Sequence, residues 1–236
     1  MGVPQEIPLT ITYNGRQVTQ MMCTPVHLKQ LVLGWLYSQG LVKSLAELQS
    51  IGVCGDLRQA TIVATPDRWE EMEGWRQVLT SGCGGGTVLA RQLHLGIPVV
   101  TAPGKWKLEF LQRQMGTALR RAPLYRETGG LHGAALVGPQ GLVAMGEDIG
   151  RHNACDKVIG QGILLGIPFR EHALLTTGRI SSEMVMKAAQ AGIPLLCSLS
   201  VTTDFAVEIG EKCGVTIVGR LCSRQPRIYS RGERIV

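Results

Sequence analysis

The sequence at residues 173–184 is ALLTTGRISSEM, and this stretch decides the fold class. Its first three residues are the bulky apolar residues of a buried strand, Gly178 permits a tight turn, and serines commonly open a helix. A strand, a glycine turn and a helix start are the usual plan of an anion site in an α/β sheet. A helix cap alone would explain either serine, but Arg179 at the turn is harder to treat as structural. The candidate ligand-binding residues here are Gly178, Arg179, Ser181 and Ser182.

Strands and helices are predicted to alternate on both sides of this stretch. Residues 132–145 read as a hairpin, and the apolar spacing over residues 105–120 predicts a helix. The tripeptide Gly-Ile-Pro occurs three times, at 96–98, 166–168 and 192–194. Glycine favours the left-handed end of a helix and proline stops it from continuing, so each copy is expected to join a helix to a following strand, such as Val99-Val100.

The N-terminal region has its own signals. Asn14-Gly15 between two alternating runs predicts a hairpin with a type I′ turn. Thr24-Pro25 is expected to begin a helix that Gly40 ends. We therefore expect a mixed α/β chain with a smaller N-terminal subdomain at residues 1–104 and a second domain at residues 105–236.

Residues 147–157, EDIGRHNACDK, hold seven polar or ionisable groups in eleven positions. A solvated helix start could account for the early acids and the later lysine. The Gly-Arg-His-Asn run within it is better explained as a ligand-facing loop and helix N-terminus. Arg151, His152 and Asn153 are therefore candidate contacts for phosphates or a guanine edge. A histidine outside this run, His132, follows another glycine turn and is more readily explained as a hydrogen-bonded structural residue.

Residues 81–86, SGCGGG, place Cys83 among glycines and a serine. A buried structural cysteine normally has apolar neighbours, as Cys197 does, so Cys83 is predicted to be accessible on a flexible backbone. Glycine N–H groups can also stabilise a thiolate. An incidental loop cysteine is the alternative. We interpret Cys83 as a reactive thiol, the kind that accepts a group in one place and delivers it in another.

Composition narrows the class of protein. The chain has 236 residues, of which 44% are hydrophobic and 18% are charged, a composition typical of a folded protein. Its net charge of +6 favours anionic ligands but is not that of a nucleic-acid-binding tail. No apolar run approaches the ~18 residues of a membrane span, and no secretory signal is apparent, so we expect a cytoplasmic protein. Seven cysteines without a C-x-x-C pair are then expected to be thiols. Five arginines lie near the C-terminus, and they form either a solvated basic edge or a phosphate-binding end. They are Arg220, Arg224, Arg227, Arg231 and Arg234.

Taken in order, these motifs resemble the FdhD/NarQ family of formate dehydrogenase accessory sulfurtransferases. The resemblance covers nearly the whole chain and is most specific at residues 147–157 and 177–187. It implies a cytidine-deaminase-like three-layer α/β domain. It also implies a carrier that takes persulfide sulfur from a cysteine desulfurase and passes it to a substrate, molybdenum bis(molybdopterin guanine dinucleotide), needed by formate dehydrogenase. Cys83 matches the family's persulfide cysteine. The family's cofactor-contact stretch corresponds to Arg220, Leu221, Cys222, Ser223, Arg224 and Gln225.

Two alternatives remain beside this interpretation. The family's loop usually carries C-x-x-C, whereas Gly86 occupies the second position here, which leaves open a chaperone that binds the cofactor without transferring sulfur. A zinc deaminase would share the implied fold, but its site needs His-x-Glu and Pro-Cys-x-x-Cys, and this sequence contains neither. We therefore expect no zinc, no other resident metal, and neither a membrane nor a nucleic-acid partner. The oligomeric state stays open, a homodimer included.

Overall fold

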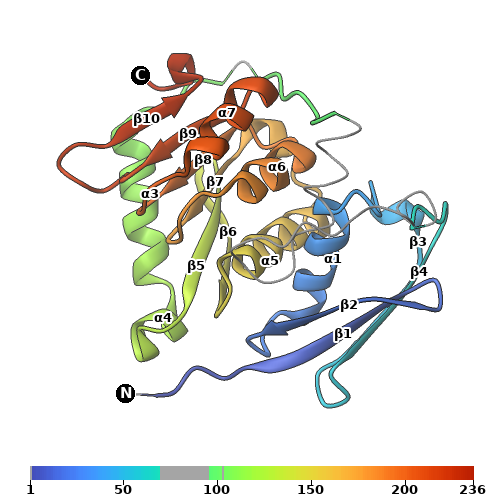
Figure 1. Cartoon of the computed structure of the whole chain (residues 1–236). Helices are drawn as coiled ribbons and strands as arrows, with labels where there is room; N and C mark the ends of the chain where they lie inside the picture. Colours follow the sequence, from blue (N-terminus) through green and yellow to red (C-terminus); the bar gives the residue numbers. More distant parts are fainter. Residues whose placement is uncertain (1, 70–95, 103) are drawn as a thin grey trace.

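The computed structural model describes residues 2–69, 96–102 and 104–236. The chain forms two mixed sheets joined by helices (Figure 1). The smaller sheet has the order β2-β1-β4-β3, in which β1 pairs antiparallel with β2 and parallel with β4. Its strands are β1 (Ile7–Tyr13), β2 (Arg16–Cys23), β3 (Leu48–Cys54) and β4 (Gln59–Ala64).

The larger sheet has the order β10-β9-β8-β7-β5-β6. Neighbours β7, β8 and β9 run parallel, while β5 is antiparallel to β7 and β6 is antiparallel to β5. β10 closes the other edge antiparallel to β9. The strands are β5 (His132–Gly138), β6 (Gly141–Asp148), β7 (Ala173–Thr176), β8 (Leu195–Ser198), β9 (Thr216–Gly219) and β10 (Arg227–Ser230).

Helices cover both faces of the larger sheet. Residues of α5 (Arg151–Leu164), α6 (Ser182–Ala191) and α7 (Asp204–Cys213) form one core with the strands. On the other face, α3 (Leu108–Arg120) packs its buried Leu111 and Met115 against the strands, and the short α4 (Pro123–Thr128) follows it (Figure 1).

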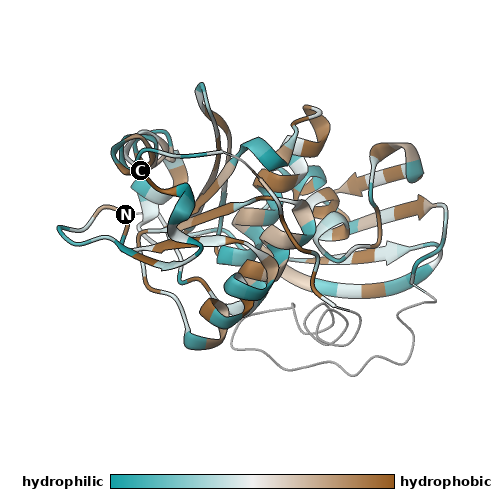
Figure 2. Ribbon diagram, turned by 90° about the horizontal axis from the view of Figure 1, so that it is seen from above, coloured by the Kyte–Doolittle hydropathy of each residue, from teal (hydrophilic) through white to brown (hydrophobic). Residues whose placement is uncertain are grey.

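The smaller sheet has one covered face. In β4 every second residue is buried, the alternation expected of a strand with one side on a core, and Figure 2 shows hydrophobic and hydrophilic residues alternating along these strands. The covering element is α1 (Leu28–Ser38), whose Leu31, Val32 and Trp35 are buried in the same core. On its opposite side α1 packs closely against α5, which connects the two sheets.

The mixed α/β class and the predicted hairpins are confirmed. Asn14 and Gly15 have φ values of 47° and 80°, as a type I′ turn requires. Gly166 and Gly192 of the Gly-Ile-Pro junctions have positive φ, and the third junction leads into β8. The division at residue 104 and the likeness to the cytidine deaminase fold stay predictions. Among the described residues, no helix is both long and apolar enough to cross a membrane.

Two predictions about elements were wrong. The first helix begins at Leu28, after a left-handed His27, and not at Thr24-Pro25. The Thr24 hydroxyl instead accepts a hydrogen bond from the N–H of Ile149, so it joins distant segments. Val99-Val100 does not form a strand, although the Val100 N–H donates to the Cys213 carbonyl.

Candidate functional site

The predicted motifs meet at one edge of the larger sheet. Because β7, β8 and β9 are parallel, the segments that follow them leave the sheet on the same side. The antiparallel pairing of β5 with β7 and of β6 with β5 brings the start of β5 and the end of β6 to that side as well. We call this the site edge, and define it as residues 128–133, 147–153, 176–183, 198–203 and 219–227.

Gly178 allows two of these segments to approach closely. A Cβ atom at Gly178 would lie 2.7 Å from the Cβ of Arg151, so no larger residue fits. The Gly178 N–H donates to the Thr176 hydroxyl at 3.2 Å, and its carbonyl accepts from the Ser198 hydroxyl at 2.5 Å. The turn after β7 is therefore held against both the start of α5 and the end of β8.

His152 lies beneath this turn and is 8% exposed. Its Nε2 atom is 3.0 Å from Oε2 of Glu183 and 3.5 Å from the hydroxyl of Ser181. Burial lowers the pKa of His152, and the hydrogen bond to Glu183 offsets part of that effect. Near neutral pH the imidazole is therefore uncharged, and the start of α5 is joined to the first turn of α6.

His132 and Thr177 form a second contact across the edge. The Thr177 hydroxyl accepts from the Gly133 N–H at 3.0 Å and is 3.4 Å from Nδ1 of His132. Burial lowers the pKa of His132, and the positive charge of Arg151 lowers it further. The hydrogen bond agrees with the structural role that the sequence favoured for His132.

Asn153 turns inward. Its amide nitrogen donates to the Met22 carbonyl at 2.8 Å and to Oδ1 of Asp148 at 3.0 Å. Asp148 and Lys157 are fully buried, with 2.7 Å between Oδ2 and Nζ. Asn153 thus supports the loop from inside the protein, and its contact with a ligand stays a prediction without structural support.

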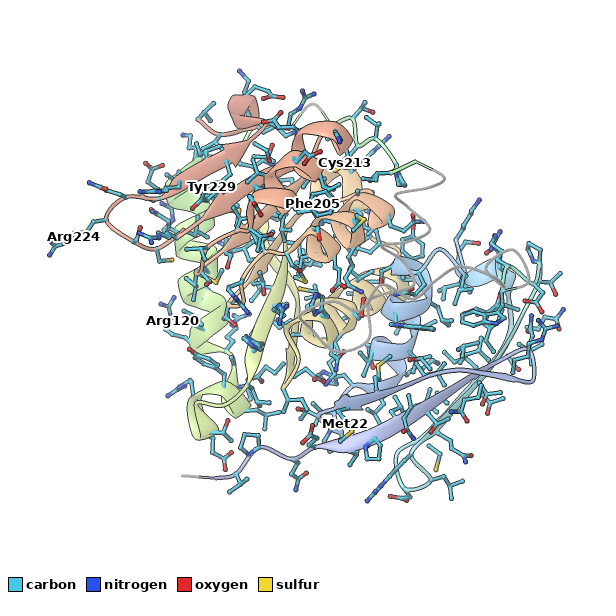
Figure 3. The ribbon with its side chains drawn as sticks, in the orientation of Figure 1. Met22, Arg120, Phe205, Cys213, Arg224 and Tyr229 are labelled. Carbon is cyan, nitrogen blue, oxygen red and sulfur yellow. The ribbon has the colours of Figure 1, made fainter. Side chains whose placement is uncertain are left out.

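The C-terminal stretch joins the edge through its backbone. The N–H groups of Arg220 and Leu221 donate to the carbonyls of Ser200 and Ser198 at 2.7 and 2.8 Å. The Leu221 side chain lies in the core, and its carbonyl accepts from the Gln112 amide at 2.9 Å. Figure 3 shows Arg224 projecting outward from the β9–β10 loop. The exposed members of the stretch are Arg220, Cys222, Ser223, Arg224 and Gln225.

The charges at the site edge favour an anionic ligand. Its acidic side chains, Glu147, Asp148 and Glu183, are all buried. Asp148 and Glu183 face Lys157 and His152, and Glu147 accepts hydrogen bonds from the backbone N–H groups of Leu124 and Tyr125. Arginines are distributed over three of its segments, and their planar guanidinium groups suit phosphates and carboxylates. These arginines are Arg151, Arg179, Arg220, Arg224 and Arg227.

Most of the described cysteines are poor nucleophiles. Burial raises the pKa values of Cys23 and Cys155 to about 12 and also raises those of Cys197 and Cys213, so their reactive thiolate forms are scarce near neutral pH. Cys222 is exposed, yet partial burial of its thiol still raises its pKa. Cys83, the predicted reactive thiol, lies outside the described residues.

The sequence did not predict several contacts that hold the site edge together. It did not predict that Glu183 pairs with His152, that Ser198 ties β8 to Gly178, or that Thr24 reaches the edge from the smaller sheet. Only Ser198 carried a usable signal, since it is a polar residue at the end of a buried strand. In the described part of the chain, no three His, Cys, Asp or Glu side chains are grouped so that they could hold a metal ion.

This geometry defines an α/β protein with a basic edge that is built from several segments. A protein-family model described as the FdhD/NarQ family matches residues 4–236, and the chain belongs to that family. The chain is 33% identical to the sulfur carrier protein FdhD of Shouchella clausii, covering 99% of this chain and 89% of the relative. It is 31% identical to the protein of the same name in Bacillus subtilis, covering 98% and 88%.

A solved structure from Desulfotalea psychrophila, described as that of a candidate formate dehydrogenase accessory protein, has the same fold. The TM-score is 0.77 and the sequence identity 27%, with 98% of this chain and 89% of that chain covered. The similarity therefore extends over both sheets and the site edge.

Proposed function

We propose that the chain carries sulfur from a cysteine desulfurase to molybdenum bis(molybdopterin guanine dinucleotide), for use by formate dehydrogenase. One observation carries the proposal: the two most specific motifs, at residues 147–157 and 177–187, meet at a single basic edge, in a chain whose relatives are named sulfur carriers. The cofactor is the substrate, and Cys83 is the carrier residue.

Loading is a thiol–persulfide exchange. The Cys83 thiolate attacks the outer sulfur of the desulfurase persulfide, the sulfur–sulfur bond of the donor breaks, and the donor cysteine leaves as a thiolate. The exchange has no net oxidation or reduction. None of the buried thiols described above can substitute readily, because their raised pKa values leave too little thiolate.

Delivery transfers the outer sulfur to the metal. The bond between the two sulfurs of the Cys83 persulfide breaks, Cys83 is released as a thiolate, and the molybdenum supplies the two electrons that convert the sulfur into a sulfide ligand. Sulfur is a soft ligand that suits this metal. The chain's own contribution is to hold the cofactor so that this sulfur can reach it.

The site edge is proposed to hold the phosphates and guanines. Arg151, Arg179 and the exposed arginines of the C-terminal stretch can pair with phosphate oxygens, and Ser182 lies in the first turn of α6, where anions are favoured. His152, which is neutral and hydrogen-bonded to Glu183, would position the edge and not supply charge. The predicted contacts whose side chains are exposed or partly exposed are Arg151, Arg179, Ser181, Ser182, Arg220, Cys222, Ser223, Arg224 and Gln225. The other predicted residues, His152, Asn153, Gly178 and Leu221, are buried, and we propose that they shape the edge.

The alternative is a chaperone that binds the cofactor without transferring sulfur. It is favoured by Gly86, which removes the second loop thiol found in the family pattern. Both functions need the same site edge, so cofactor binding cannot distinguish them. They differ in whether Cys83 becomes a persulfide.

Mass spectrometry after incubation with a cysteine desulfurase and cysteine separates the two functions. We expect one added sulfur atom on the peptide that contains Cys83, and its loss in Cys83→Ala. Cys222→Ala is the matched control, because Cys222 is an exposed thiol at the site edge. Added sulfur that persists in Cys83→Ala and disappears in Cys222→Ala would contradict the assignment.

Binding of GDP, used as a probe for the guanine end of the cofactor, tests the site edge. Arg179→Gln should weaken binding by about tenfold, the size of one lost charge-assisted contact, while Arg120→Gln should not. Cys83→Ala should bind GDP normally and still fail to restore formate dehydrogenase activity to cells that lack the carrier. Normal activity with Cys83→Ala would favour the chaperone.

A further inference from the structure

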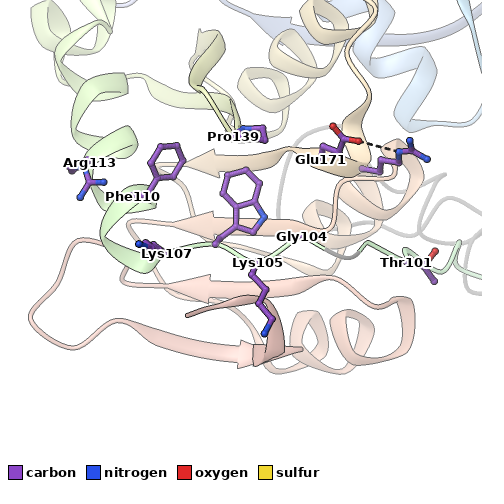
Figure 4. A pocket seen from close by; sticks show the side chains of 10 residues that line it. Thr101, Gly104, Lys105, Lys107, Phe110, Arg113, Pro139 and Glu171 are labelled. Atoms are coloured by element: carbon purple, nitrogen blue, oxygen red, sulfur yellow. Dashed lines mark ion pairs between the residues drawn. The ribbon is translucent and has the colours of Figure 1, made fainter.

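A cavity of about 720 Å³ lies at the opposite edge of the larger sheet from the site edge. It is bounded by the β5–β6 turn at Pro139, by Arg170 and Glu171 before β7, and by the start of α3 (Figure 4). β5 is seven residues long and runs from the site edge to Pro139, so the two places are roughly 20 Å apart. The volume is within the usual range of small-molecule sites, roughly 300–1,000 Å³.

The floor of the cavity is apolar and firmly built. Trp106 is 6% exposed, and its backbone is fixed to the C-terminal segment: its N–H donates to the Arg234 carbonyl at 2.7 Å, and its carbonyl accepts from Val236 at 2.9 Å. The Trp106 and Phe110 rings are 6.1 Å apart and inclined by 35°. With Pro139, these rings provide rigid, flat surfaces that suit a planar molecule.

The rim carries an excess of positive charge. Four basic residues line the cavity, Lys105, Lys107, Arg113 and Arg170, against a single acid, Glu171. Glu171 pairs with Arg170 at 3.7 Å, and within the described part of the chain no ion pair involves the other three. Figure 4 shows Lys107 and Arg113 at the α3 end of the cavity and Glu171 at the other end. The α3 end is therefore the anion-attracting end.

We propose that this cavity binds an anion with a flat apolar body, of the chemical class of a mononucleotide. The planar part would lie on Phe110, Pro139 and the accessible edge of Trp106, and the anionic group would contact Lys107 and Arg113. The proposal does not depend on sulfur transfer. It rests on a preformed apolar floor beside cations that no described acid neutralises.

Nuclear magnetic resonance can locate binding at this cavity in the full chain. The indole N–H signal of Trp106 is assigned by its loss in Trp106→Phe, and the protein is titrated with AMP, adenosine and inorganic phosphate. AMP should shift the Trp106 signal and leave the signal of Trp35, which lies in the core of the smaller sheet, unchanged. Adenosine and phosphate should each bind about tenfold more weakly than AMP, since each lacks one half of the recognised chemistry.

Charge variants test the rim without disturbing the core. Lys107→Gln/Arg113→Gln should weaken AMP binding at Trp106 by about tenfold. Arg120→Gln/Arg121→Gln removes the same charge from exposed positions at the other end of α3, and it should leave AMP binding at Trp106 unchanged. Arg179→Gln alters the site edge and should also leave AMP binding at Trp106 unchanged. An unmoved Trp106 signal, equal binding of adenosine and AMP, or equal losses in the rim and control variants would each overturn the proposal.

Discussion

His152 shows how a single, almost fully buried residue can connect the segments of the site edge. The two largest effects on its pKa oppose each other: burial disfavours the imidazolium, and the carboxylate of Glu183, 3.0 Å away, favours it. The positive charges of Lys187 and Arg151 add to the effect of burial. Burial is the larger effect, so the pKa is lowered. The neutral ring can still accept or donate one hydrogen bond, which is enough to connect α5 and α6 without competing with the arginines for an anion.

Replacing Glu183 by Gln tests this balance at the scale of one residue. The change removes the negative charge that raises the pKa of His152 and keeps nearly the same volume, so the pKa should fall further below its ordinary value. A pH titration of the His152 ring signal by nuclear magnetic resonance measures it. Glu208→Gln is the control, because Glu208 pairs with Lys212 on the surface of α7. A pKa that stays the same or rises in Glu183→Gln would show that the carboxylate does not act on the ring.

At the scale of elements, the contact between α1 and α5 is made possible by two glycines. A Cβ atom at Gly34 would lie 1.8 Å from the Asp156 carbonyl oxygen, and one at Gly160 would lie 1.9 Å from the Gln30 carbonyl oxygen. The obstacles are backbone atoms, which cannot rotate away as a side chain can. The two helices therefore approach backbone to backbone, and this contact sets the distance between the smaller sheet and the larger one.

Gly160→Ala should consequently lower the free energy of unfolding by at least about 1–3 kcal/mol, the usual cost of overpacking. Gly116→Ala in α3 is the matched control: its Cβ atom would lie 3.4 Å from the mobile end of Arg120, so alanine should stabilise that helix by roughly 0.5–1 kcal/mol. Urea unfolding of both variants measures the difference. Equal free energies of unfolding for the two variants would mean that α1 and α5 can move apart at no cost, which would contradict the prediction.

The elements were largely predictable from sequence because each depends on local patterns. The Asn14-Gly15 turn, the hairpin that starts at His132, and the buried strands before Gly178 and after Gly192 have short, specific signals. Local patterns did not bring Arg151 and Gly178 together, because that contact depends on the pairing of β6 with β5 and of β5 with β7. They also failed at Thr24, which has the composition of a helix cap but accepts a hydrogen bond from Ile149, 125 positions later. No local pattern encodes such a partner.

At the scale of the whole molecule, two buried polar clusters join the smaller sheet and α1 to the rest of the chain. In one, the Lys187 ammonium is 2.6 Å from Asp156 and 3.0 Å from the Ser38 hydroxyl, which connects α6, α5 and α1. In the other, Lys157 and Asp148 contact the backbone of Thr24 through its carbonyl and N–H groups. Buried charges of this kind are tolerated only when fully paired, so they specify how the parts fit together.

Removing the Lys157 charge should therefore destabilise the whole molecule. Lys157 is fully buried, and its ammonium donates to the carbonyls of Thr24 and Glu147 at 3.0 and 2.9 Å and pairs with Asp148 at 2.7 Å. Lys157→Met keeps the length of the side chain but leaves the Asp148 carboxylate buried and uncompensated. We expect a loss of about 3–5 kcal/mol in the free energy of unfolding, measured with urea.

The control for this prediction is Lys212→Met, which breaks the exposed pair with Glu208 and should cost less than about 1 kcal/mol. The double variant Asp148→Asn/Lys157→Met distinguishes a coupled pair from two independent residues. When Asp148 is already replaced by the neutral Asn, removing Lys157 leaves no uncompensated charge in the core. The double variant should therefore lose clearly less stability than the sum of the two single variants. Strictly additive losses would show that the two charges do not stabilise one another.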